Sequence, residues 1–143
     1  MEKLSKETEK IMNERFGGDS IISLATAVDN IPYVRNVDAF YLDGSFYVLT
    51  YGLSSKMGQI EKNPIVAVSG EWFTAHGKGI NLGYFGKPEN EFIADKMKTV
   101  FSRWIDNGHN NFDDENTCIL RIELTDGVLF SNGKCYEIDF SAK

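Results

Sequence analysis

The sequence is short of the residues that build metal sites and disulfides. Its 143 residues include only 2 Cys and 2 His. Cys118 and Cys135 occur in apolar runs without CxxC spacing, so we expect two reduced cysteines that act as small buried hydrophobes. His76 and His109 lie far from any third cluster of ligand-like residues, and no HExxH or EF-hand pattern occurs. The sequence therefore predicts no bound metal.

Excess basic charge and long apolar runs are also missing. The net charge is −6 and the pI is about 4.9, whereas nucleic-acid binders usually carry a basic surface. The first ten residues are charged without an apolar core, and no apolar run is long enough to cross a membrane. We therefore expect a cytoplasmic protein without nucleic-acid or membrane partners. A local basic cluster for one small phosphate stays compatible with this composition.

Aromatic residues, in contrast, are plentiful at 13% of the chain. They can fill a barrel core and a dimer interface, or some of their rings can line a pocket for a flat ligand. The length supports one domain over residues 1–143, which is enough to bury a core.

Hydrophobic spacing and turn residues predict the elements. A helix is expected from its N-cap Ser5 to Gly17, a short one from Ser54-Ser55 to Lys62, and a third from Pro88 to Ile105. Two-residue turns are expected at positions 29–30, 43–44 and 132–133, and a further turn at 75–77. The predicted strands are 20–28, 31–42, 45–50, 65–73, 78–85, 118–124, 128–130 and 135–140. Strands in hairpins with segregated helices predict an α+β fold, an antiparallel six- or seven-stranded split β-barrel with flanking helices.

The most informative stretch for chemistry begins at Arg35, a charged residue within an apolar and aromatic strand. After the following hairpin, Ser54, Ser55 and Lys56 open a helix, and helix N-termini bind phosphates through free N–H groups. Lys56 would add charge, and Arg35 can hold two phosphate oxygens with its planar fork. Taken alone, such serines are more often a simple N-cap, such a lysine a solvated surface residue, and such an arginine a strand-edge charge.

The run RNVDAFYLDGSFYVLTYGLSSKMGQIEKNPIVAV, residues 35–68, resembles the core signature of the pyridoxamine 5′-phosphate oxidase-like, FMN-binding split-barrel superfamily. The shared features are an Arg-led strand, an Asp-Gly hairpin, an aromatic strand ending in Thr, a Ser-x-Lys helix start and an Asn-Pro before a Val-rich strand. By its short length the chain looks more like the general-stress-protein and nitroimidazole-resistance type members than the larger pyridoxamine phosphate oxidases.

The resemblance implies FMN as cofactor, bound at a homodimer interface where the second subunit completes the pocket. By position, Arg35, Ser55 and Lys56 would hold the phosphate, with Ser54 beside them at the helix start. Positions that border the flavin are Asn36, Val37, Asp38, Leu49 and Thr50. Trp72, Trp104, Phe130 and Tyr136 are candidate ring neighbours, for each of which a core or interface role is equally open.

The C-terminal stretch VLFSNGKCYEIDFSAK lacks the Trp and Arg-His segment of the larger pyridoxamine phosphate oxidases, so oxidation of pyridoxamine phosphate is not expected. The resemblance implies an FMN-dependent oxidoreductase that reduces a small organic acceptor with NAD(P)H as donor. Two alternatives stay open: a non-catalytic flavin-binding stress protein, and a relative that binds haem or a deazaflavin instead. No residue of the sequence is identified as a catalytic acid or base.

Overall fold

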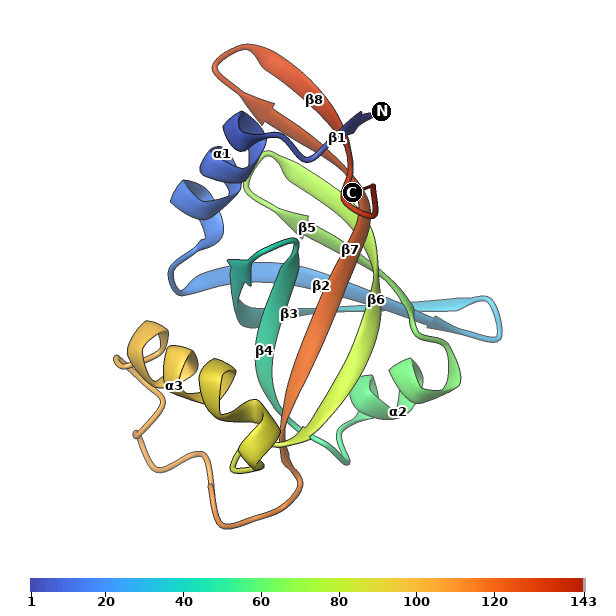
Figure 1. The fold of residues 1–143 in the computed structure, drawn as a ribbon. Helices are drawn as coiled ribbons and strands as arrows, with labels where there is room; N and C mark the ends of the chain where they lie inside the picture. Colours follow the sequence, from blue (N-terminus) through green and yellow to red (C-terminus); the bar gives the residue numbers. More distant parts are fainter. Residues whose placement is uncertain (143) are drawn as a thin grey trace.

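The computed structural model describes residues 1–142 and shows a closed antiparallel barrel (Figure 1). Six strands form it in the order β7-β4-β3-β2-β5-β6, and pairing of β6 with β7 closes the ring. Strand β8 pairs with the far end of β7, and the short β1 runs parallel to β8. The strands are β1 (Glu2–Lys3), β2 (Ser20–Val28), β3 (Ile31–Leu42), β4 (Ser45–Tyr51), β5 (Ile65–Gly70), β6 (Phe73–Tyr84), β7 (Thr117–Ser131) and β8 (Lys134–Asp139). The predicted α+β split barrel is confirmed, with six strands in the ring.

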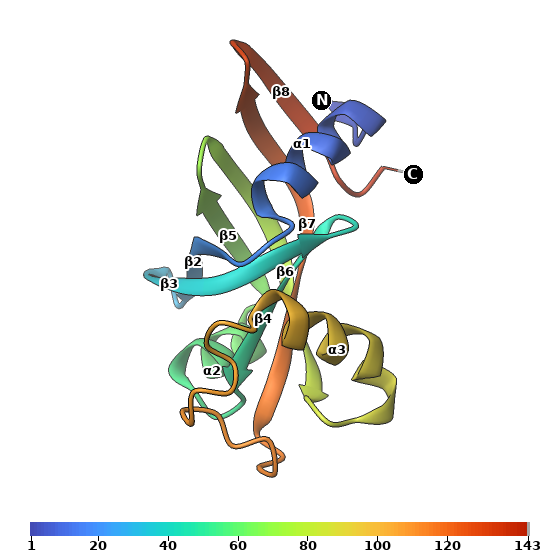
Figure 2. The same ribbon diagram turned by 90° about the vertical axis from the view of Figure 1, so that its left-hand side faces the viewer.

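Three α-helices flank the barrel: α1 (Lys6–Phe16), α2 (Ser55–Lys62) and α3 (Glu91–Val100). Figures 1 and 2 show α1 and α3 on opposite sides of β3. The predicted N-cap of α1 is confirmed, because Ser5 Oγ accepts a hydrogen bond from Thr8 N at 3.1 Å and Thr8 Oγ1 accepts one from Ser5 N at 2.9 Å. None of the helices in residues 1–142 is long and apolar enough to span a membrane.

Strand β4 shows why the protein has two apolar clusters. Phe46 and Val48 point into the barrel, where Met12 and Phe16 of α1 join them. Tyr47 faces outward and is covered by a second cluster that includes Met97 of α3. Both faces of β4 are therefore buried, which explains its nearly continuous apolar sequence.

The structure corrects the prediction for β5 and β6. The strand 65–73 ends at Gly70, the turn lies at Glu71-Trp72, and the segment expected to turn at 75–77 is part of the continuous strand β6. Trp72 adopts a left-handed conformation with φ of 52°, which a bulky residue rarely does, so the sequence gives no turn signal there. Gly77 is needed for a close approach of strands instead: a Cβ on it would lie 2.7 Å from the backbone oxygen of Glu123.

Three smaller predictions are also wrong, and one short strand was not predicted. Strands 118–124 and 128–130 form one continuous strand, β7, with a bulge opposite His76 and Gly77. The third helix begins with a 3₁₀ turn (Pro88–Asn90) and ends at Val100, and residues 101–106 continue as turns. Strand β1 was not expected. Cys118 is buried and reduced as predicted, but Cys135 is exposed.

The close approach at Gly77 leads to a stability prediction. Gly77→Ala is expected to destabilise the protein by about 1–3 kcal/mol, because the added methyl group forces two paired strands apart. Gly58→Ala is the matched control: a Cβ on this exposed α2 position meets nothing within 4 Å, so the change should stabilise by about 0.5–1 kcal/mol. Urea unfolding of both variants measures the difference, and equal stability of the two would contradict this role of Gly77.

Candidate functional site

Arg35 lies on β3 and extends its guanidinium towards β2 and α2. Its Nη1 donates to the carbonyl oxygen of Leu24 at 3.2 Å and to Thr26 Oγ1 at 2.9 Å, and its Nη2 donates to Gln59 Oε1 at 2.6 Å. All three acceptors are neutral. Within residues 1–142, no carboxylate forms an ion pair with Arg35. Burial lowers the pKa of the guanidinium, which still remains cationic at neutral pH.

Lys56 brings a second positive charge close to Arg35. It lies in the first turn of α2, where Nζ donates to Thr50 Oγ1 at 2.6 Å. Burial lowers the pKa of Lys56, and the positive charge of Arg35 lowers it further. No carboxylate of the described residues pairs with Lys56 either. Two neighbouring cations without a counter-charge make a site that favours an anion.

Ser54 adds an unsatisfied hydroxyl group at the same place. It is the N-cap of α2, but its side chain makes no capping hydrogen bond. Its buried Oγ is without a hydrogen-bond partner among the described residues, which costs about 1–3 kcal/mol for a group of this kind. The first N–H groups of α2 also have no hydrogen-bond partner within the helix, and the first turn contains no acidic residue. A phosphate would satisfy these donors and both cations, so the residues present fit that group.

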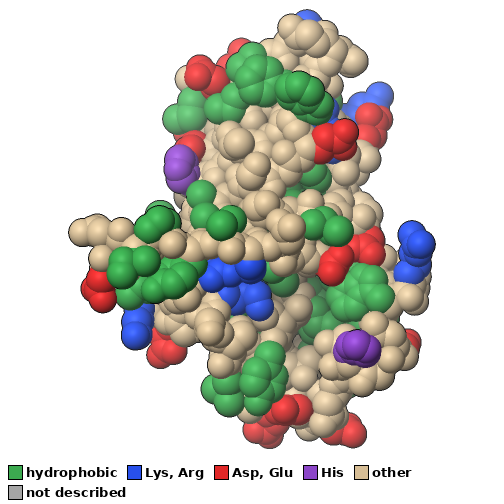
Figure 3. All heavy atoms as spheres, turned by 180° about the vertical axis from the view of Figure 1, so that it is seen from behind, with side chains coloured by type: hydrophobic (Ala, Val, Ile, Leu, Met, Phe, Trp, Pro, Cys, Tyr) green, Lys and Arg blue, Asp and Glu red, His purple; other side chains and the backbone are tan. Residues whose placement is uncertain are grey.

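We call Arg35, Thr50, Ser54, Ser55 and Lys56 the basic cradle. Figure 3 shows Lys and Arg side chains gathered beneath the projecting β2–β3 hairpin, with hydrophobic side chains around them. Three consecutive elements supply these residues: β3 carries Arg35, β4 carries Thr50 one residue before its end, and α2 begins after the next loop.

The other predicted positions on β3 and β4 divide between two faces of the sheet. Val37 packs against the barrel core on the same side as Arg35. Asn36 and Asp38 point to the outer face, where Ser23 Oγ donates to Asn36 Oδ1 at 2.9 Å. Burial raises the pKa of Asp38, and the nearby Asp19 adds to the effect. Leu49 packs outward against the α3 cluster, so it does not join the cradle.

Trp72 is not part of the cradle within one chain. It lies in the β5–β6 turn, at the opposite end of β5 from α2, and is 71% exposed. Its ring makes an edge contact with Phe130 at 6.4 Å between centroids. Trp104 packs against the α3 cluster and donates to Asp19 Oδ2 at 2.9 Å, and Tyr136 donates to Glu7 Oε1 at 2.8 Å. None of these rings borders the cradle of its own chain.

Two cradle neighbours were not predicted. Thr26 is 2% exposed and accepts from Arg35, and Gln59 accepts from Arg35 one helical turn after Ser55. The available signals were a polar residue at an inward-facing position of β2 and a four-residue spacing that places Ser55 and Gln59 on one face of α2.

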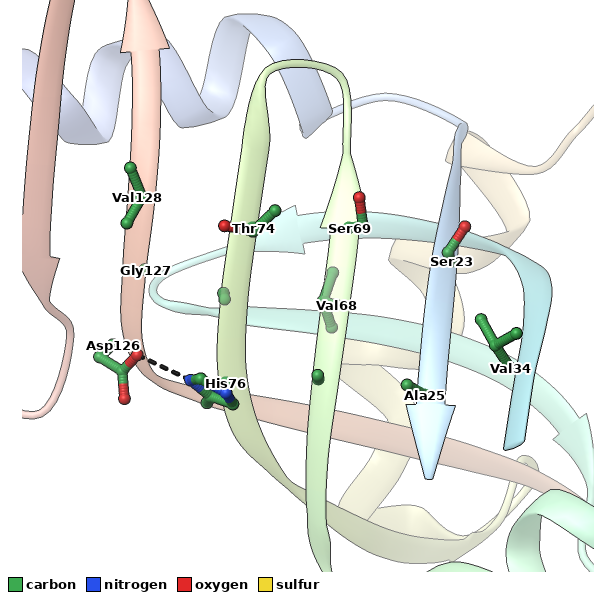
Figure 4. Close-up of a pocket in the computed structure, with 12 residues that line it drawn as sticks. Ser23, Ala25, Val34, Val68, Ser69, Thr74, His76, Asp126, Gly127 and Val128 are labelled. Atoms are coloured by element: carbon green, nitrogen blue, oxygen red, sulfur yellow. Dashed lines mark hydrogen bonds and ion pairs between the residues drawn. The ribbon is translucent and has the colours of Figure 1, made fainter. Parts of the chain in front are cut away.

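A separate groove of about 300 Å³ lies on the outer face of β2, β5, β6 and β7 (Figure 4). Two small residues line it side by side, because Ala25 pairs with Ala67 across β2 and β5, and Ala67 pairs in turn with His76 on β6. His76 Nδ1 lies 2.9 Å from Asp126 Oδ1, the residue paired with it on β7. Val34 lines the groove while the next residue, Arg35, points to the other face, so groove and cradle open on opposite sides of the β2–β3 sheet. No group of three or more His, Cys, Asp or Glu in the described chain is placed to hold a metal ion.

The six-stranded barrel with flanking helices defines a class of small split-barrel folds, and solved structures with that fold superpose on this chain. An FAD-binding protein from Mesorhizobium loti matches with a TM-score of 0.65 and 21% identity over 87% of this chain and 92% of that one. General Stress Protein 26 from Bacillus anthracis matches with a TM-score of 0.64 and 19% identity, over 90% of this chain and 97% of that one. A candidate pyridoxamine 5′-phosphate oxidase from Listeria innocua matches with a TM-score of 0.64 and 11% identity, over 87% of this chain and 96% of that one.

The chain therefore has the fold of the pyridoxamine 5′-phosphate oxidase-like split-barrel superfamily, and the predicted resemblance is confirmed at the level of the fold. The haem storage protein HutZ from Vibrio cholerae shares this fold, with a TM-score of 0.62 and 16% identity over 85% of this chain and 90% of HutZ. No protein-family model and no curated protein matches the sequence.

Proposed function

We propose that the protein is an FMN-binding flavoprotein, an oxidoreductase that reduces a small organic acceptor with NAD(P)H as donor. One observation carries the proposal: Arg35 and Lys56 have no carboxylate partner in residues 1–142, and the buried Ser54 Oγ next to them has no hydrogen bond. The fold shared with an FAD-binding protein supports a flavin as the ligand.

The charges of the cradle match the terminal phosphate of FMN. A phosphate monoester carries about −1.5 to −2 charges at neutral pH, which Arg35 and Lys56 balance. Arg35 would contribute a planar fork and Lys56 a point charge, while Ser54, Ser55 and the first N–H groups of α2 would donate hydrogen bonds. Riboflavin lacks the phosphate, so the cradle should distinguish the two flavins.

When bound, the flavin supplies the electron and hydride transfer, and the protein contributes binding, orientation and access. We propose that the second subunit of a homodimer completes the pocket around the ring. Exposed apolar residues on β2 and β3, including Ile21, Ile31 and Val34, support such an interface. Trp72 would then border the ring only from the second subunit. The two unpaired cysteines support a cytoplasmic location.

The visible absorption spectrum of the purified protein, before and after addition of FMN, tests the proposal. We expect a flavin spectrum that co-purifies, or flavin fluorescence that is quenched on titration, with binding much tighter for FMN than for riboflavin. Colourless protein that leaves the fluorescence of FMN unchanged would contradict the proposal. Oxidation of NAD(P)H with an added quinone or nitroaromatic acceptor then tests turnover, and bound flavin without turnover would favour a non-catalytic stress protein.

A haem-binding function is the second candidate, and His76 favours it. Asp126 occupies Nδ1 of this exposed imidazole, which leaves Nε2 open towards solvent, the usual arrangement of a metal-ligating histidine. The protein also shares its fold with HutZ. A Soret band that disappears in His76→Ala would support haem in place of flavin, and a deazaflavin would show an absorption band distinct from both.

A further inference from the structure

Gln59 is held in a closed ring of hydrogen bonds with Arg35 and Thr26. Its Oε1 accepts from Arg35 Nη2 at 2.6 Å and from Thr26 Oγ1 at 2.6 Å, while Thr26 Oγ1 also accepts from Arg35 Nη1 at 2.9 Å. Because Thr26 is buried on β2 and Gln59 belongs to α2, the ring ties the helix to the sheet. It also fixes the direction of the guanidinium.

These contacts orient Arg35 without neutralising it. An amide oxygen and a hydroxyl accept hydrogen bonds but carry no net charge. A carboxylate at position 59 would accept the same bonds and form a salt bridge, which would remove the attraction of Arg35 for an anionic ligand. The neutral side chain at this position therefore leaves the positive charge of Arg35 available.

The amide group of Gln59 also has donors to spare. With Oε1 taken by two donors, the amide orientation is determined, and Nε2 makes no hydrogen bond to any residue that the structure describes. Ser55, Lys56 and Gln59 lie one turn or less apart on one side of α2. The two N–H groups of Nε2 are thus open to water or to a ligand in the cradle.

We infer that Gln59 is a positioning residue that aims Arg35 at a terminal phosphate monoester while keeping its charge uncompensated, and so sets the preference of the site for FMN over riboflavin. The inference rests on the proposed function. It assigns a role to the single glutamine of the sequence and to Thr26 as its support.

Gln59→Glu tests the inference, because it keeps the shape of the side chain and adds one negative charge against Arg35. The ratio of FMN to riboflavin affinity should fall at least about tenfold, with riboflavin affinity unchanged, since one charge-assisted contact is lost. Lys62→Gln is the matched control, with the same change in net charge at an exposed position of the same helix, and should leave the ratio unchanged. Gln59→Met removes the acceptor without adding charge and should lower the ratio less than Gln59→Glu does.

A spectroscopic readout checks that the effect is local. Protein labelled with ¹⁵N-glutamine contains one labelled side-chain amide group, whose pair of N–H signals should shift on addition of FMN but not of riboflavin. A ratio in Gln59→Glu equal to that of the wild type, or an amide signal indifferent to FMN, would overturn the inference.

Failure of the proposed function gives a different pattern, in which the wild type itself binds FMN and riboflavin alike. The inference is then tested by inorganic phosphate alone. A rise in the melting temperature of the wild type that is absent in Gln59→Glu supports it. An equal rise in both proteins, or no rise in the wild type, overturns it.

Discussion

Replacing Lys56 by Met is expected to weaken FMN binding at least about tenfold, while the protein without ligand keeps or gains stability. The loss of affinity follows from the removal of a charge-assisted phosphate contact, which contributes about 1.5–3 kcal/mol. Stability should not fall with it, because the ammonium group is partly buried beside Arg35 without a carboxylate of residues 1–142 to balance it. Met fills nearly the same volume with an unbranched apolar chain.

The pH dependence of stability shows whether the positive charge of Lys56 stabilises or destabilises the fold. Burial, with Arg35 adding to it, holds the pKa of Lys56 in the folded state below its ordinary value of 10.5. The unfolded chain therefore binds more protons between the folded-state pKa and 10.5, so the free energy of unfolding rises with pH through that window. Below the window the protonated lysine destabilises the fold. Lys56→Met should lack this rise.

Urea unfolding of both proteins at a series of alkaline pH values measures the difference. Burial raises the pKa values of Tyr47 and Cys118, so both groups also titrate at high pH, but they do so in both proteins and cancel in the comparison. Lys62→Met, at an exposed position of the same helix, should leave both FMN affinity and the pH profile unchanged. A Lys56→Met protein that is less stable by about 2 kcal/mol or more would show that the hydrogen bond to Thr50 outweighs the burial of charge.

The turns show which parts of the fold could be predicted. Asp43-Gly44 and Asn132-Gly133 were predicted as two-residue hairpins, and in both pairs each residue has a positive φ, which these residue types adopt at low cost. In the turn at Glu71-Trp72 only Trp72 has a positive φ, and a bulky residue rarely adopts that conformation, so the sequence does not signal the turn. At Gly77 the sequence predicts a turn that the structure does not contain. The glycine instead permits close contact between two strands, and that contact exists only in the folded sheet.

The residues in and around the basic cradle also differ in whether the sequence could predict them. Residues next to element boundaries, such as Ser54 and Lys56, could be proposed from the sequence because a helix start has donors wherever it lies. Thr26 and Gln59 could not, because their contact with Arg35 depends on the register between β2 and β3 and on where α2 docks. Side chains alternate between the two faces of a strand, so the sequence could have separated Asn36 and Asp38 from Arg35. A family resemblance applied position by position does not distinguish these faces.

Phe46→Ala is expected to have the largest effect on stability, a loss of about 3–5 kcal/mol in the free energy of unfolding. The side chain is 0% exposed, and its ring contacts those of Phe16, Tyr41 and Phe73 at centroid distances of 5.6, 5.7 and 6.3 Å. It thus joins α1, β3 and β6 at the centre of the barrel, where rigid strands cannot close around the space that is left. Such a loss is a large part of the 5–15 kcal/mol, roughly, that stabilises a domain.

Phe92→Ala provides the control on α3. Phe92 is 73% exposed, so its removal should change the free energy of unfolding by less than about 0.5 kcal/mol. Guanidinium unfolding of both variants, followed by near-ultraviolet circular dichroism, measures the two changes under the same conditions. Equal losses of unfolding free energy in the two variants would mean that the packing of α1 and the strands does not depend on Phe46. If Phe46→Ala is strongly destabilised but still gains stability from FMN, the cradle persists without a fully packed barrel, because its contacts are made among β2, β3, β4 and α2.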